Sequence, residues 1–70
     1  MAEVVQGQLR SEIRRGLAVA IVLKKDQRSG ALTWGVVQDI LTSAARHTRG
    51  IKVRLTDGQV GRVQRIGIMD

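Results

Sequence analysis

The sequence predicts a small all-β protein, an antiparallel SH3-like barrel of four to five short strands, and three observations carry this prediction. From residue 17 onward apolar residues recur at every second position, which is the period of a β-strand. An Asp-Gly pair separates two alternating runs, which is typical of a hairpin. Of the 70 residues, 43% are hydrophobic and only 1% are aromatic, so the core must be aliphatic.

The first twelve residues are expected to form a partly ordered segment ahead of a barrel domain over residues 13–70. Val5, Leu9 and Ile13 recur every four residues, which favours a helical stripe. Gly7 lies inside this stripe and disfavours a stable helix. We therefore expect a frayed or partly helical segment in which Ile13 is the first anchored side chain.

Two strands are predicted in the first half of the barrel. Residues 17–23 are apolar on both faces, which indicates a strand covered on both sides or one with a bulge. The polar run 24–30 predicts a loop, in which Asp26, Ser29 and Gly30 build the turn. The second strand is expected from about Leu32 to Leu41, with a bulge or sharp bend at Gly35.

A loop over residues 42–50 follows, with one helical turn expected over residues 43–46. The clearest pattern comes next, because residues 51–55 alternate strictly between apolar and basic side chains. Asp57 and Gly58 then predict a type I′ turn, which needs positive φ at both central positions. A further strand over residues 59–63 and a short closing strand with Ile66 and Ile68 would complete the sheet.

Closure of these strands into a barrel would bury one set of aliphatic side chains and remove the exposed sheet edges. The expected core consists of Val19, Ile21, Leu23, Val37, Ile40, Ile51, Val53, Leu55, Val60, Val63 and Ile66.

Three blocks of the chain resemble the YwbE family, a group of small bacterial proteins of uncharacterised function. They are residues 21–30 (IVLKKDQRSG), 35–42 (GVVQDILT) and 50–63 (GIKVRLTDGQVGRV). A more distant likeness is to KOW-type SH3-like barrels of ribosomal and transcription proteins, carried by Ile13, Gly16, Val19, Ile21, Gly35, Val37 and Ile40. That likeness implies contact with RNA or ribosomal components by fold-level analogy.

The charge of the chain is strongly positive and concentrated near its C-terminal end. Lys and Arg number 12 against 6 Asp and Glu, which gives a formal net charge of +6. The stretch 46–65 holds six basic residues and one acidic residue. Such clustering creates a local field that attracts anionic partners.

The candidate nucleic-acid-binding residues follow from this charge. Lys52 and Arg54 should project from the same side of one strand, and Arg62 could share that surface across the turn. A solvated outer face is the plain alternative. The residues expected to contact phosphate are Lys52, Arg54, Arg62, Arg46, Arg49 and Arg65, with a second patch of Lys24, Lys25 and Arg28.

Trp34 and His47 are the two remaining side chains of interest. Trp34 is expected to cap one end of the core, with a base-stacking platform as the alternative. A lone aromatic residue favours recognition of phosphate or duplex shape over extensive base stacking. His47 stands alone and is expected to hydrogen-bond locally in its loop or to sit near phosphate.

Other functions find little support in the sequence. Without cysteine and with one histidine, we expect no metal or cofactor, and no catalytic motif is present. No apolar run approaches the ~20 residues of a membrane span, and we expect a cytoplasmic protein. The leading hypothesis is a non-enzymatic barrel that binds RNA or a ribonucleoprotein. The alternatives are a module for an acidic protein and an assembly subunit that joins through the strand edge 51–55.

Overall fold

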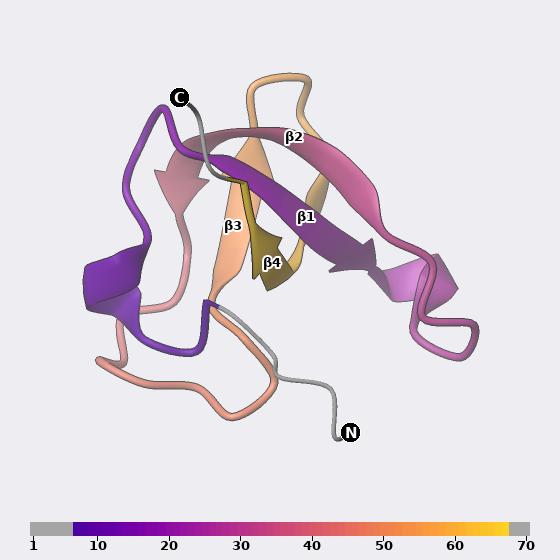
Figure 1. The fold of residues 1–70 in the computed structure, drawn as a ribbon, viewed down its shortest axis with the longest axis horizontal. Helices are drawn as coiled ribbons and strands as arrows, with labels where there is room; N and C mark the ends of the chain where they lie inside the picture. Colours follow the sequence, from indigo (N-terminus) through magenta and orange to yellow (C-terminus); the bar gives the residue numbers. More distant parts are fainter. Residues whose placement is uncertain (1–6, 68–70) are drawn as a thin grey trace.

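Four antiparallel strands close into a barrel in this computed structural model, which describes residues 7–67. The strands are β1 (Ala18–Leu23), β2 (Thr33–Ile40), β3 (Lys52–Leu55) and β4 (Val60–Ile66). Each strand pairs with the next, and β4 pairs with β1 to close the ring (Figure 1). The predicted all-β class and small antiparallel barrel are confirmed. Because β3 is paired on both sides, the strand edge 51–55 is not open for pairing with another copy, which corrects that part of the assembly hypothesis.

The interior of the barrel is filled by aliphatic side chains from all four strands. Val19, Ile21, Val37, Val53, Leu55 and Val63 are buried, together with Ile13 and Ile51 just outside the strands. Leu23, Ile40 and Ile66 pack against this cluster while partly exposed, as does Leu17. Val60 was expected here, but it pairs with Arg54, whose side chain points outward, and it is only partly buried.

Trp34 does not cap the core, so that prediction is wrong. It lies on the outer side of β2, opposite Ala20 of β1, and is 57% exposed. The reason is register, because its neighbours Thr33 and Gly35 pair with the inward-pointing Ile21 and Val19. Side chains alternate between the two faces of a strand, so Trp34 must point out.

The bulge expected at Gly35 is absent, whereas the register of β1 against β4 does shift between Ala20 and Ile21, within the strand expected to be covered on both sides or bulged. Gly35 pairs regularly with Val19, whereas the register shifts between Val37 and Asp39 on β2 and again along the β1–β4 pair. Gly35 is needed for space instead, since a Cβ there would lie 2.5 Å from Cδ1 of Leu55. Its small size therefore admits the Leu55 side chain to the barrel interior.

The N-terminal segment is anchored earlier than expected. The helical part is a single 3-10 turn, η1 (Arg10–Glu12), and the chain is already fixed at Gly7, whose carbonyl accepts a hydrogen bond from Ile51 N–H at 2.8 Å. Residues 8–10 continue alongside residues 45–47 through two such hydrogen bonds, from Arg10 N–H to Ala45 O and from His47 N–H to Gln8 O (Figure 1). Val5 and Ile68 lie outside the described residues.

The loops differ from the predictions in detail. Residues 43–46 form a bend and a bridge to Leu9 in place of the expected helical turn. The loop after β1 begins with a 3-10 turn, η2 (Lys24–Asp26), and closes through Gly30 N–H donating to Asp26 O at 2.8 Å. The expectation that Asp26, Ser29 and Gly30 build this turn is confirmed, because Ser29 Oγ also donates to Asp26 O.

The β3–β4 hairpin is confirmed, but its turn is not of type I′. No non-glycine residue among those described has positive φ, so Asp57 cannot adopt the required conformation, while Gly58 has φ of 92°. Leu55 instead exchanges hydrogen bonds with Gly58 and Gln59, which is the pattern of a three-residue loop with a left-handed glycine. Gln59 also donates to Asp57 from its backbone at 3.0 Å and from its side chain at 2.7 Å.

Replacement of Gly61 by alanine is expected to destabilise the barrel. A Cβ at Gly61 would collide with the backbone carbonyl of Val22 and come within 3.0 Å of Ile21 Cδ1, so β1 and β4 could not keep their spacing. Overpacking of this kind costs about 1–3 kcal/mol in the free energy of unfolding. Urea denaturation measures it, with Gln38→Ala on the exposed side of β2 as a control expected to change stability by less than about 0.5 kcal/mol. Equal stability of the two variants would contradict this packing.

The Asp57 carboxyl provides a test of the turn. Its hydrogen bonds from the Gln59 side chain and then the Gln59 backbone lower its pKa below the ordinary 3.8. A carboxyl with a depressed folded-state pKa stabilises the fold above its unfolded pKa, and that contribution is lost as pH falls through the lowered value. NMR titration should give a pKa below 3.8, which rises in Gln59→Ala. An identical pKa in both proteins would show that the side-chain bond is absent.

Candidate nucleic-acid interface

Two adjoining hollows on the outer surface of the barrel collect basic side chains. Their volumes are about 470 and 420 Å³, and Val22, Gln27 and Arg62 line both. We call them together the basic groove, defined by its cations Lys24, Arg49, Lys52 and Arg62. The other residues that line it are Val22, Gln27, Gly30, Thr48, Val60, Gly61 and Gln64.

The barrel register places Lys52 and Arg62 side by side. They are directly paired across β3 and β4, and Arg62 is paired with Val22 on its other side. The next residues along the strands, Val53 and Gly61, point inward, so Lys52 and Arg62 must point out. The strict alternation of residues 51–55 thus turns Lys52 toward the solvent, and its pairing with Arg62 places both cations on the same side of the sheet.

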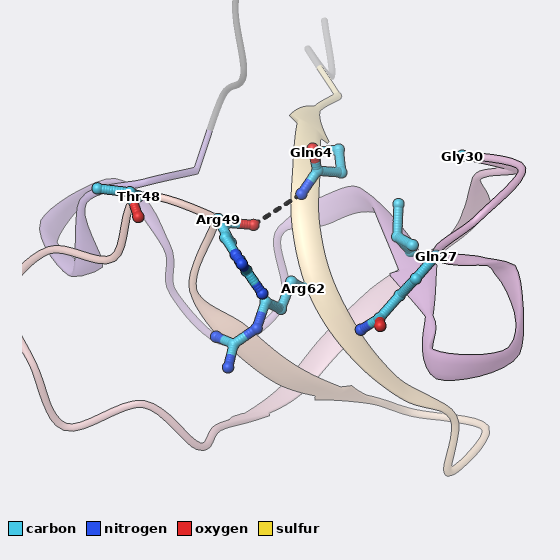
Figure 2. Close-up of a pocket in the computed structure, with 7 residues that line it drawn as sticks. Gln27, Gly30, Thr48, Arg49, Arg62 and Gln64 are labelled. Atoms are coloured by element: carbon cyan, nitrogen blue, oxygen red, sulfur yellow. Dashed lines mark hydrogen bonds between the residues drawn. The ribbon is translucent and has the colours of Figure 1, made fainter.

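A bulge in β4 holds the loop that carries Arg49 beside the groove. Ile21 pairs with Val63 and Ala20 with Arg65, which leaves Gln64 as the extra residue on β4. Gln64 Nε2 then donates to the Arg49 carbonyl at 2.8 Å, a bond drawn in Figure 2. The predicted local role of His47 is confirmed, because its Nδ1 accepts from Arg49 N–H at 3.1 Å. Together these bonds fix the backbone that carries Arg49.

Two loops flank β4 at the groove. Figure 2 shows Thr48 and Arg49 on one side of the strand and Gln27 and Gly30 on the other, with Arg62 projecting from the strand itself. Arg62 is held in place because its Nη1 donates to the Gly50 carbonyl at 3.1 Å. Lys24 adds a charge from the start of the second loop, next to Lys52 and Arg62 in the smaller hollow.

Arg54 shares the outer side of β3 but is drawn away from the groove. It lies opposite Asp39 of β2, and its Nη1 is 3.4 Å from Asp39 Oδ2. Arg15 approaches the same carboxylate at 3.8 Å. Within residues 7–67 these are the ion pairs recorded, so no described carboxylate pairs with Lys24, Arg49, Lys52 or Arg62.

The remaining predicted contacts lie apart from the groove. Arg46 is exposed in the loop that bridges to Leu9. Arg65 lies on the outer side of β4 opposite Ala20, with its Nη1 donating to Gln64 O at 2.9 Å. Lys25 and Arg28 are exposed in the loop after β1 and do not line either hollow. The structure therefore unites four of the nine predicted cations and separates five.

The neutral side chains of the groove were not predicted from the sequence. Gln27 was assigned only to a loop, and Gln64 reaches the groove because of a bulge that no residue pattern announces. The sequence did contain a signal for Val22 as a surface contact. Its strand is apolar on both faces, so the face that points away from the core was expected to be covered as well. The alternation that assigned Val60 to the core failed because that residue pairs with Arg54 on the outer side.

Two further observations concern membrane and metal. Over the part of the chain that the structure describes, no helix is long and apolar enough to cross a bilayer. Among the same residues, no three His, Cys, Asp or Glu side chains gather closely enough to hold a metal ion.

The fold and the groove together define a small closed β-barrel with a basic groove on its outer surface. A family model described as "Uncharacterized conserved protein (DUF2196)" matches residues 6–66. "Uncharacterized protein YwbE" of Bacillus subtilis (strain 168) is 56% identical over 62 residues, which are 89% of this chain and 95% of the relative. The chain belongs to this family, which confirms the resemblance found in its sequence blocks. No solved structure matches significantly, and the likeness to KOW-type barrels stays a prediction.

The Gln64–Arg49 hydrogen bond is expected to order the loop that carries Arg49. Gln64→Ala removes the donor and should lower the free energy of unfolding by about 1 kcal/mol. It should also increase amide hydrogen exchange at Arg49 and Gly50, measured by NMR, while exchange in the β3–β4 turn stays unchanged. Unchanged protection at both sites would mean that the loop is ordered without this bond.

Proposed function

We propose that this barrel is a non-catalytic RNA-binding protein whose basic groove contacts the phosphate backbone. The observation that carries the proposal is the convergence of Lys24, Arg49, Lys52 and Arg62 in a groove whose described lining includes no acidic side chain. Thr48 is the one hydroxyl residue of the described lining, and the lining offers no histidine or carboxylate to act as its base. A binding role is therefore favoured over a catalytic one.

The chemistry of the groove suits a row of phosphates. Arginine can grip a phosphate through two parallel hydrogen bonds, and lysine adds a compact charge. Arg62 lines both hollows, with Arg49 in the larger one and Lys24 and Lys52 in the smaller one, so the cations follow one another along the groove. Phosphate contacts position a protein without reading bases, so binding should depend weakly on RNA sequence.

An acidic protein is the competing partner for the same charges. Protein interfaces have an apolar, largely desolvated centre with aromatic or aliphatic anchors. The groove offers only Val22 and Val60 as larger apolar side chains, surrounded by cations and amides. RNA, alone or in a ribonucleoprotein, is therefore the better match, and this assignment implies a cytoplasmic location, where RNA is used.

The salt dependence and the position of the charges test the proposal. If the four groove cations each neutralise one phosphate of a single strand, log K should fall with log salt at a slope of roughly −3. Arg49→Glu combined with Lys52→Glu should reduce affinity at low salt at least roughly ten-fold and flatten the slope. Fluorescence anisotropy with a labelled RNA measures both. Arg62 is left intact in this variant because it also holds the Gly50 carbonyl.

A matched control carries the same change of net charge elsewhere. Arg14→Glu with Arg46→Glu alters two exposed arginines outside the groove. It should retain most of the affinity, because the groove is intact. Equal losses in both variants would mean that only net charge matters, and absence of salt-dependent RNA binding would reject the proposal. A protein partner that stays bound after nuclease treatment, and is lost in the groove variant, would favour the acidic-protein alternative.

A further inference from the structure

The outward position of Trp34 gives it an environment unlike that of a core residue. Its partner on β1 is Ala20, which lies on the outer side because Val19 and Ile21 point inward. Ala20 is nevertheless 0% exposed. Larger side chains on the neighbouring strands must therefore cover it, and those directly opposite are Trp34 on β2 and Arg65 on β4.

The indole of Trp34 lies across β1 and packs against small residues. A Cβ built on Gly67, beyond the end of β4, would lie 3.2 Å from Cζ3 of Trp34 and 3.3 Å from Cβ of Ala18. The ring therefore extends from β2 over Ala18 and Ala20 to Gly67. One side of the indole rests on the barrel, and its 57% exposure leaves the other side open to solvent.

This open ring lies on the same outer side of β1 as the basic groove, displaced from it toward Ala18 and Gly67. Ala20 and Val22 are neighbours on the outer side of β1, about 6.5–7 Å apart for residues two positions apart on a strand. Val22 lines both hollows of the groove and is paired with Arg62. The ring reaches toward Ala18, two such steps from Val22, and one step is comparable to the separation of neighbouring nucleotides in an extended single strand. A single strand with phosphates in the groove would thus bring a base over the indole about two nucleotides further along.

We propose that Trp34 is a stacking platform for an unpaired base, so that the nucleic acid held in the basic groove is single-stranded. This inference rests on the proposed function and names its substrate class. Stacking on an aromatic ring requires a base that is free of its own duplex stack. The single aromatic residue favoured recognition of phosphate or duplex shape; this inference keeps the phosphate contacts and replaces duplex shape with an unpaired base.

The fluorescence of the protein provides the test, because Trp34 is its one tryptophan. A single-stranded RNA of about ten nucleotides without self-complementarity should quench the emission as it binds. Inorganic polyphosphate carries the phosphates without bases, so it should compete for the groove without quenching. A duplex of the same sequence should bind more weakly than the single strand.

Three variants separate stacking from other roles of this surface. Trp34→Ala should weaken single-stranded RNA binding roughly ten-fold while leaving polyphosphate binding unchanged. Trp34→Phe should recover part of the loss, because it keeps an aromatic ring. Val36→Ala, an exposed apolar neighbour two residues along β2, should change neither affinity. Circular dichroism checks that each variant is folded.

The outcomes distinguish this inference from the proposed function. RNA binding that is lost in the Arg49→Glu, Lys52→Glu protein but gives no quenching, and is unaffected by Trp34→Ala, would overturn the platform and leave the groove in place. Equal losses in Trp34→Ala and Val36→Ala, or loss of a protein partner in place of RNA, would show that this face is an apolar contact for protein. Absence of both RNA and polyphosphate binding would overturn the groove itself.

Discussion

Closure of four short strands around an aliphatic core is the constraint on which the rest of the structure depends. The interior is filled by buried side chains such as Ile21, Leu55 and Val63. Every second residue of each strand must then point outward. Whatever chemistry this protein performs is therefore displayed on its outer surface, and the register of the barrel decides which side chains become neighbours.

Two local features of the sheet concentrate the positive surface charge on one side of β3. Gln64 is the extra residue of the bulge in β4, and its side chain holds the Arg49 loop beside the strand. Arg49 thereby joins Lys52 and Arg62 at the groove. On the other side of β3, Asp39 engages Arg54 at 3.4 Å. An exposed pair of this kind is weak in energy but reduces the local field. The positive charge that carries no described ion pair is thereby concentrated at the groove.

Local patterns in the sequence predict the hairpin and the aliphatic core. They do not predict which residues meet across the barrel. The alternation of residues 51–55 correctly predicted that Lys52 and Arg54 share a side. It could not reveal that Asp39, fifteen positions away, lies opposite Arg54. The same limit explains Trp34. An aromatic residue in an aliphatic chain is expected inside, and only the pairing of β1 with β2 shows that its position faces out.

The most direct test of the account is a chemical-shift map of the labelled protein with a short single-stranded RNA, which asks whether groove and indole form one continuous surface. The account predicts changes at Lys24, Arg49, Lys52 and Arg62 and at the indole N–H of Trp34, saturating together at one RNA concentration. Signals of Gln38 and Arg46, outside this surface, should remain in place. Changes centred on Arg46 or on the β2–β3 side, with the groove signals unmoved, would contradict it.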